Sequence, residues 1–174
     1  MLFSSTIENF PLHQAVKNQD ISATLTQLRE ASCEDFDRVI VCYNLEQIAL
    51  YGERNAAGAA AKLLAIKIHT LVVHFKLLHA IAENNVEKVE SILNTNRKII
   101  NVSQNFPFIR GVSHSLLWIV KSSWATASQA LMQTESNDPQ LLQLQDLVAN
   151  SLKIWNLLTK FDQQKKSSGA TLPQ

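Results

Sequence analysis

The chain has 174 residues, a formal net charge of +1, 46% hydrophobic residues and 18% charged residues. Length and composition predict one globular domain, and the near-neutral charge argues against nucleic acid as a ligand, because phosphate backbones attract strongly basic surfaces. With only 4 Gly and 4 Pro, the chain lacks the turn residues that a many-stranded sheet needs, which favours an all-α fold.

The first residues contain no basic region followed by a long apolar run, so no secretory signal peptide is expected. The apolar run from Leu71 to Leu78 is interrupted by His74 and Lys76 and is too short to cross a bilayer. We therefore expect a cytoplasmic protein without integral membrane insertion. Its cysteines, at positions 33 and 42, are expected to be free thiols.

A first pair of short helices is predicted near the N-terminus. Pro11 suits the first turn of a helix, where its missing N–H costs nothing. Asp20 can cap a second helix that carries Ile21, Leu25 and Leu28 on one side. Residues 55–83 follow without a helix breaker after Gly58, and the pattern leaves open whether they form one long helix or two shorter units.

Residues 76–101 also read as two amphipathic helices in succession, with Asn85 as the cap of the second. Such a pair cannot bury both apolar faces alone and needs neighbours. The positions expected in the core are Leu78, Ile81 and Ala82 of the first helix, and Val86, Val89, Ile92 and Leu93 of the second.

The two pairs are related by spacing. Leu12-His13 and Leu78-His79 lie 66 residues apart, which is twice 33, with a similar start at Leu45 halfway between them. A fourth start at Leu116 comes 38 residues after Leu78, five more than the period. An internal repeat is the simplest explanation.

These residues resemble the ankyrin-repeat family, whose repeat of about 33 residues opens with T-P-L-H-x-A. Pro11-Leu12-His13-x-Ala15 and Leu77-Leu78-His79-x-Ile81-Ala82 match that opening, and Ile100-Asn101 is similar to the Val-Asn that closes a repeat. The resemblance implies about four stacked antiparallel helix pairs over residues 10–132, with His13 and His79 in structural roles. The alternative is an irregular helical bundle.

A long C-terminal helix is predicted over residues 139–162. Asp138-Pro139 is a helix start signal, and apolar residues then recur every three or four positions to Phe161. Residues 163–174 have almost no apolar content and are expected to form a flexible tail. The predicted organisation is a single helical domain, residues 1–162, followed by this tail.

No catalytic, cofactor or metal site is expected. The histidines at positions 69, 74 and 79 recur every five residues, a spacing that does not bring side chains to one face of a straight helix. Cys33 and Cys42 stand in no known nucleophile motif. A small helical enzyme, or enzyme subunit, with a site assembled from distant residues remains the alternative function.

The predicted function is a non-enzymatic adaptor or inhibitor that binds another protein, in one version a bacterial effector acting in the host cytoplasm. The ankyrin resemblance implies that a concave groove carries the binding residues. The five-residue excess before the fourth unit predicts a projecting loop at 105–110, with the alternative that its aromatic rings fold back on the last helix. The binding residues predicted on these two grounds are Lys17, Asn18, Leu50, Tyr51, Glu83, Asn84, Lys121 and Ser122 in the groove, and Phe106, Phe108 and Arg110 in the loop.

Overall fold

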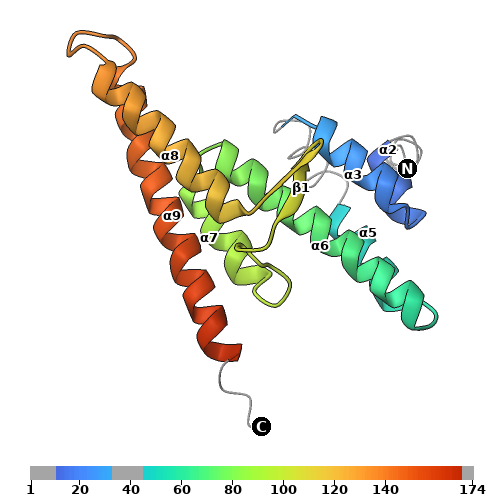
Figure 1. The fold of residues 1–174 in the computed structure, drawn as a ribbon. Coiled ribbons are helices and arrows are strands. Elements are labelled where there is room, and N and C mark those ends of the chain that lie inside the picture. The colour runs from blue at the N-terminus through green and yellow to red at the C-terminus, as the bar shows by residue number, and fades with distance from the viewer. Residues whose placement is uncertain (1–10, 33–44, 170–174) are drawn as a thin grey trace, which may run out of the picture. The chain divides into compact units, whose positions relative to one another are not determined.

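The computed structural model describes residues 11–32 and 45–169 (Figure 1). These residues form seven helices and two short strands, which confirms the prediction of a mostly helical protein. The length predicted one domain, but the contacts group the chain into two compact units, Met1–His79 and Ala80–Gln174. We call them unit 1 and unit 2.

Unit 1 contains α2 (Pro11–Lys17), α3 (Ile21–Glu30), α5 (Leu45–Asn55) and most of α6 (Ala59–Ala82). α2 packs against both α3 and α5. Gly52 of α5 leaves room for the side chain of Gln19, which follows α2, because a Cβ at position 52 would lie 2.5 Å from Nε2 of Gln19. The core includes Leu12, Val16, Leu28, Ala49, Ile68, Val72 and Phe75.

α6 is one continuous helix of 24 residues, which settles the choice that the sequence left open for residues 55–83. It is long and apolar enough to cross a membrane by length and composition, so the run 71–78 belongs to a longer apolar segment than we expected. Of its most apolar window, however, 67% is buried inside the protein, as in the core helix of a soluble protein.

Two links between consecutive helices have the same geometry. In the α2–α3 link, Gln19 adopts a left-handed backbone with φ 58°, and the N–H of Asp20 donates to the carbonyl of Ala15 at 2.9 Å. In the link from α6 to α7 (Val86–Thr95), Asn84 has φ 57°, and the N–H of Asn85 donates to the carbonyl of Ala80 at 3.1 Å. Such a pattern satisfies carbonyls that the last turn of a helix otherwise leaves unpaired.

The residue after each left-handed position caps the next helix. The Asp20 side chain accepts a hydrogen bond from the N–H of Ala23 at 3.0 Å, and that of Asn85 accepts one from Lys88 at 3.1 Å. Adding 65 to the bounds of α3 gives the bounds of α7. The α2–α3 and α6–α7 links are therefore alike, with an offset of 65 rather than the 66 read from the Leu-His pairs.

The one-residue difference changes which residues of α6 correspond to the buried residues of α2. Leu77, the counterpart of Leu12, is fully buried, whereas Leu78 is only half-buried and Ala82 is exposed, so the core assignment of these two residues was wrong. The predicted core positions of α7 agree better with the observed burial. Val89, Ile92 and Leu93 are buried there, and Val86 is half-buried.

Residues 106–114 of unit 2 form a β-hairpin, made of β1 (Phe106–Ile109) and β2 (Val112–His114). Gly111 supplies the left-handed backbone that the tight turn requires, with φ 81°. The pairing shifts register within β1, which accommodates Pro107. The predicted projecting loop is therefore wrong, because alternation along the strand turns the rings of Phe106 and Phe108 inward, where both are buried.

α8 (Leu116–Gln133) and α9 (Leu141–Gly169) form a long antiparallel hairpin in unit 2 (Figure 1). The buried residues are Leu116, Val120 and Ala127 on α8, and Ile154, Leu158 and Phe161 on α9. α7 also packs against α9. The long C-terminal helix was predicted, but residues 163–169, which were expected in a flexible tail, continue α9 by two further turns.

Candidate functional site

The eleven predicted binding residues are divided between the two units. Lys17, Asn18 and Tyr51 are exposed in unit 1, and Tyr51 has 69% of its surface accessible. The side chain of Leu50 lies outside the described residues. The remaining predicted residues belong to unit 2, where they differ widely in exposure.

Several predicted binding residues of unit 2 are engaged within the protein. Glu83 pairs with Lys88 at 3.0 Å, and Asn84 makes hydrogen bonds to α9. Phe106 and Phe108 lie together in the core, with their ring centroids 5.7 Å apart. Arg110 and Lys121 are exposed, and Ser122 is half-buried.

Lys121 instead marks an aromatic cluster in the middle of the α8–α9 hairpin. The rings of Trp124 and Trp155 lie 5.4 Å apart, and Nζ of Lys121 lies 5.9 Å from the centroid of the Trp155 ring. Nearer the start of α8, the half-exposed Trp118 stacks on His114 of β2, with centroids 3.8 Å apart. These contacts hold aromatic side chains in place at the start and in the middle of the hairpin.

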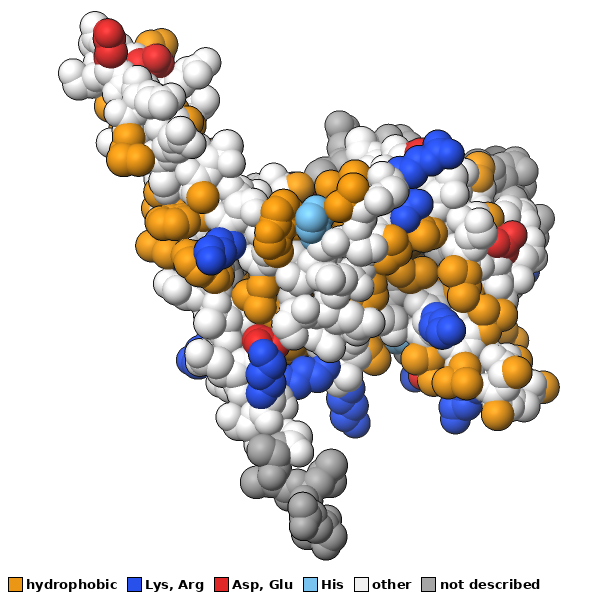
Figure 2. All heavy atoms as spheres, viewed as in Figure 1, with side chains coloured by type: hydrophobic (Ala, Val, Ile, Leu, Met, Phe, Trp, Pro, Cys, Tyr) orange, Lys and Arg blue, Asp and Glu red, His pale blue; other side chains and the backbone are white. Residues whose placement is uncertain are grey.

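The far end of the hairpin is apolar and only partly covered. Between Ala127 of α8 and Ser151 of α9, no residue is buried. We call residues 128–150 the hairpin tip. Figure 2 shows hydrophobic side chains on the surface of this hairpin. Met132 is 81% exposed and Leu142 is 72% exposed. The large apolar residues of the tip are Leu131, Met132, Leu141, Leu142, Leu144, Leu147 and Val148.

The opposite end of α9 forms a basic pocket with the segment that follows α7. The pocket has a volume of about 600 Å³, and we call it the α9 pocket. Among the described residues, those that line it with a charge are Arg97, Lys98, Lys160 and Lys165. The polar lining residues are Gln163, Gln164, Ser167 and Ser168.

Two of the four cations are held by contacts within unit 2. Arg97 donates a short hydrogen bond to the side-chain oxygen of Gln164, and its guanidinium lies 5.8 Å from the ring centroid of Phe161. Lys165 donates a short hydrogen bond to the carbonyl of Ile100. Burial lowers the pKa of Lys165 below 10.5, and the nearby charge of Asp162 partly opposes this shift.

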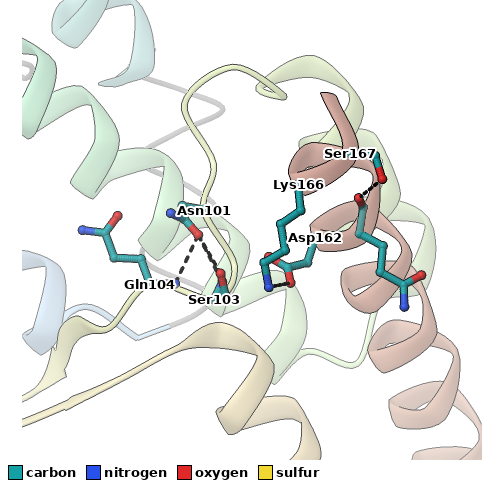
Figure 3. Close-up of polar contacts among 7 residues, drawn as sticks. Asn101, Ser103, Gln104, Asp162, Lys166 and Ser167 are labelled. Carbon is teal, nitrogen blue, oxygen red and sulfur yellow. Dashed lines mark hydrogen bonds and ion pairs between the residues drawn. The ribbon is translucent and has the colours of Figure 1, made fainter. Parts of the chain in front are cut away.

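Figure 3 shows the polar contacts around this end of α9. Lys166 forms an ion pair with Asp162 at 2.6 Å, so this acid already has a partner. The Asn101 side chain accepts hydrogen bonds from the backbone N–H groups of Ser103 and Gln104, at 3.3 and 3.2 Å, and so closes the turn that leads toward β1.

The histidines of α6 are buried, and two have identified polar contacts. Nδ1 of His69 lies 2.9 Å from a carboxylate oxygen of Glu53 on α5, and Nδ1 of His74 lies 2.7 Å from the carbonyl of Thr70. The described residues contain no group of three histidine, cysteine, aspartate or glutamate side chains that could hold a metal ion. Cys33 and Cys42 lie outside the described residues.

Sequence reasoning missed both the hairpin tip and the α9 pocket. The apolar spacing of α9 predicted that this helix covers something, but the exposure of its first turns depends on how far α8 and α7 extend beside it. The basic residues of the pocket come from two segments about 65 positions apart. Only the run Gln163-Gln164-Lys165-Lys166 gave a local signal of basic character.

Comparison of the chain with protein-family models, with curated proteins and with solved structures finds no match.

Proposed function

We propose that this protein is a non-enzymatic interaction module that binds another protein through the hairpin tip, residues 128–150. The observation that carries the proposal is the absence of any buried residue in this segment, despite its seven large apolar side chains. Two helices of a hairpin can cover only the faces that they turn toward each other. A third apolar element is needed to cover the rest.

The chemistry of the tip suggests what this third element is. Exposed apolar surface that forms a continuous patch on a folded protein commonly marks an interaction site. Two antiparallel helices offer a groove between them, and the amphipathic helix of a partner can pack its apolar face into such a groove. The charged residues from position 122 to 152 are all acidic, namely Glu135, Asp138 and Asp146. The partner helix is therefore expected to have a basic rim.

The repeated links support the resemblance to ankyrin-like helix pairs. The α2–α3 and α6–α7 links have matching left-handed residues, matching hydrogen bonds and matching caps. We propose that these two pairs are divergent ankyrin-like units, with α6 as a departure because it is one long helix. In this reading the pairs are the scaffold of the protein, while the tip binds the partner.

The test compares a tip variant with a matched surface variant. Leu142→Glu combined with Leu147→Glu places charge on the tip, whereas Leu63→Glu changes a 61% exposed leucine of α6 in unit 1. Both proteins should keep the helical circular dichroism and melting temperature of the wild type. We expect partner binding, measured by cross-linking from a photoreactive residue at position 132, to be lost only in the tip variant.

Two outcomes would count against the proposal. Retention of the cross-linked partner by the Leu142→Glu, Leu147→Glu protein would show that the tip does not bind it. A concentration-dependent dimer that the tip substitutions dissociate would show that a second copy of this chain covers the tip. Light scattering after size-exclusion chromatography separates this second outcome from binding of another protein.

A further inference from the structure

The α9 pocket is lined by a cluster of positive charges, although the protein as a whole is nearly neutral. The whole chain has a net charge of +1, yet one pocket is lined by Arg97, Lys98, Lys160 and Lys165, and the described part of its lining contains no acidic residue. Among the described residues, Lys98 and Lys160 form no ion pair. Four like charges at one site repel one another, and a bound anion would relieve that repulsion.

The positions of these cations are restrained by the fold. Arg97 is held by Gln164 and by the ring of Phe161, and Lys165 is held by the carbonyl of Ile100. A guanidinium has five N–H donors and an ammonium has three, so each of these groups keeps donors for a ligand after making its internal contacts. Restrained donors lose less entropy when they bind an anion.

Nearby negative groups offset only part of this charge. Asp162 is paired with Lys166 at 2.6 Å. Glu90 lines a smaller neighbouring pocket of about 220 Å³, which shares Arg97 and Lys160 with the α9 pocket. The C-terminal end of a helix carries roughly half a negative charge, which is small against four cations. The Ser167 and Ser168 hydroxyls also donate to helix carbonyls there, at 3.0 and 2.9 Å.

We propose that the α9 pocket binds a ligand that carries two or more phosphate groups. Phosphate oxygens accept charge-assisted hydrogen bonds from arginine and lysine, and arginine can do so in a bidentate way. A volume of about 600 Å³ lies within the range of roughly 300–1,000 Å³ that is typical of small-molecule sites. The side-chain amide of Gln163 can donate to a phosphate oxygen, whereas the two serine oxygens, whose protons are directed to helix carbonyls, can accept from a ligand hydroxyl. This site is separate from the hairpin tip and does not depend on the proposed protein partner.

The test uses calorimetry on the full chain with three probes, namely inositol hexakisphosphate, inorganic phosphate, and vesicles of phosphatidylcholine with a phosphoinositide. We expect inositol hexakisphosphate to bind more tightly than inorganic phosphate, and its affinity to fall as salt shortens the Debye length. If the soluble probe binds and the vesicles do not, the ligand is a soluble polyphosphate. If the vesicles bind and the soluble probe competes, it is a lipid headgroup.

A charge-matched pair of variants tests whether binding depends on this pocket rather than on net charge. Lys98→Glu with Lys160→Glu reverses two charges of the pocket, and Lys62→Glu with Lys67→Glu makes the same change on exposed lysines of α6. The pocket variant should bind inositol hexakisphosphate at least about tenfold more weakly, and the α6 variant should bind it as the wild type does. Lys160→Arg, which keeps the charge, should retain binding.

The proposal is overturned if none of the three probes binds to the wild-type protein. It is also overturned if both double variants lose affinity equally, because the effect would then come from net charge alone. Melting temperatures measured without ligand should be similar for the two double variants. If the pocket variant does not fold, Lys160→Gln alone provides the comparison, and unchanged binding by that protein would overturn the assignment.

Discussion

The Ser151 hydroxyl donates a hydrogen bond of 3.4 Å to the side-chain oxygen of Asn84, across 67 positions of the chain. The amide nitrogen of Asn84 donates to the backbone carbonyl of Leu147 at 3.5 Å, so this side chain bridges one turn of α9. Asn84 also has the left-handed backbone that ends α6, a conformation that asparagine tolerates better than most residues. A single residue therefore ends one helix and ties its turn to another.

Substitutions at Asn84 should separate these two roles. Asn84→Ala removes both hydrogen bonds and leaves a residue with a Cβ in the left-handed region, so we expect a loss of about 2–3 kcal/mol in the free energy of unfolding. Asn84→Gly removes the bonds but relieves the backbone, and should cost about 1 kcal/mol. Urea denaturation measures both. Equal effects of the two substitutions would mean that the backbone conformation contributes nothing.

Leu77 and Leu78 provide a direct test of the repeat offset. Leu77 is fully buried, so Leu77→Ala should lower the free energy of unfolding by about 2–5 kcal/mol through the cavity it leaves. Leu78 is half-buried, and the same truncation there should cost clearly less. If urea denaturation shows a larger loss in the free energy of unfolding for Leu78→Ala than for Leu77→Ala, the offset of 66 is supported instead.

The buried rings of the β-hairpin give a third prediction. Phe108→Ala should destabilise the protein by about 3–5 kcal/mol, because the ring is 5% exposed and packs beside Phe106. The neighbouring Ile109 is 57% exposed, and Ile109→Ala should change stability by less than about 0.5 kcal/mol. A small fall in melting temperature for Phe108→Ala would instead indicate that this ring is exposed, as it would be in a projecting loop.

The lowered pKa of Lys165 predicts a pH dependence with a definite sign. Burial disfavours the charged ammonium in the folded state, so the folded protein binds fewer protons at this site than the unfolded chain, whose pKa is near 10.5. The unfavourable contribution of Lys165 is fully present below its folded pKa and disappears as the pH rises toward 10.5. The contribution of this group to the free energy of unfolding therefore increases with pH in that window.

Nuclear magnetic resonance of the methylated lysine side chains measures this directly. The Lys165 signal, assigned by its absence in Lys165→Arg, should titrate below 10.5. A midpoint at or above 10.5 would contradict the burial of its ammonium group. Comparison of the two proteins by urea denaturation at about pH 8 and about pH 10 should show the wild type gaining stability relative to the variant.

Much of the helical structure could be predicted because its signals are local. Asp20 and Asn85 cap the helices for which they were predicted, and the apolar spacing of Val89, Ile92 and Leu93 identified a buried face. The spacing could not fix the phase of α6, because this helix is apolar on nearly all sides. Leu77 and Leu78 are equivalent in hydropathy, and only the surrounding packing distinguishes them.

The candidate sites were harder to predict because they depend on contacts between distant segments. Phe106 and Phe108 have the composition of an interface loop, but pairing with residues 112–114 turns them inward. Arg97 meets Gln164 only because α7 packs against α9. The tip is only partly covered, with no buried residue between positions 127 and 151, and this depends on where the neighbouring elements end.

The two matching links also have a consequence for the order in which the chain folds. Their hydrogen bonds join residues three to five positions apart, so little chain entropy is lost in forming them, and each link can form on the microsecond timescale of helix growth, about 1 μs. The bond between Asn84 and Ser151 closes a segment of 67 positions and belongs to a later step. Loss of the Asp20 cap should therefore slow refolding, whereas loss of the Ser151 hydroxyl should mainly accelerate unfolding. In the turn after α6, the backbone hydrogen bonds form early in folding, and the Asn84 side chain forms its hydrogen bonds to α9 late.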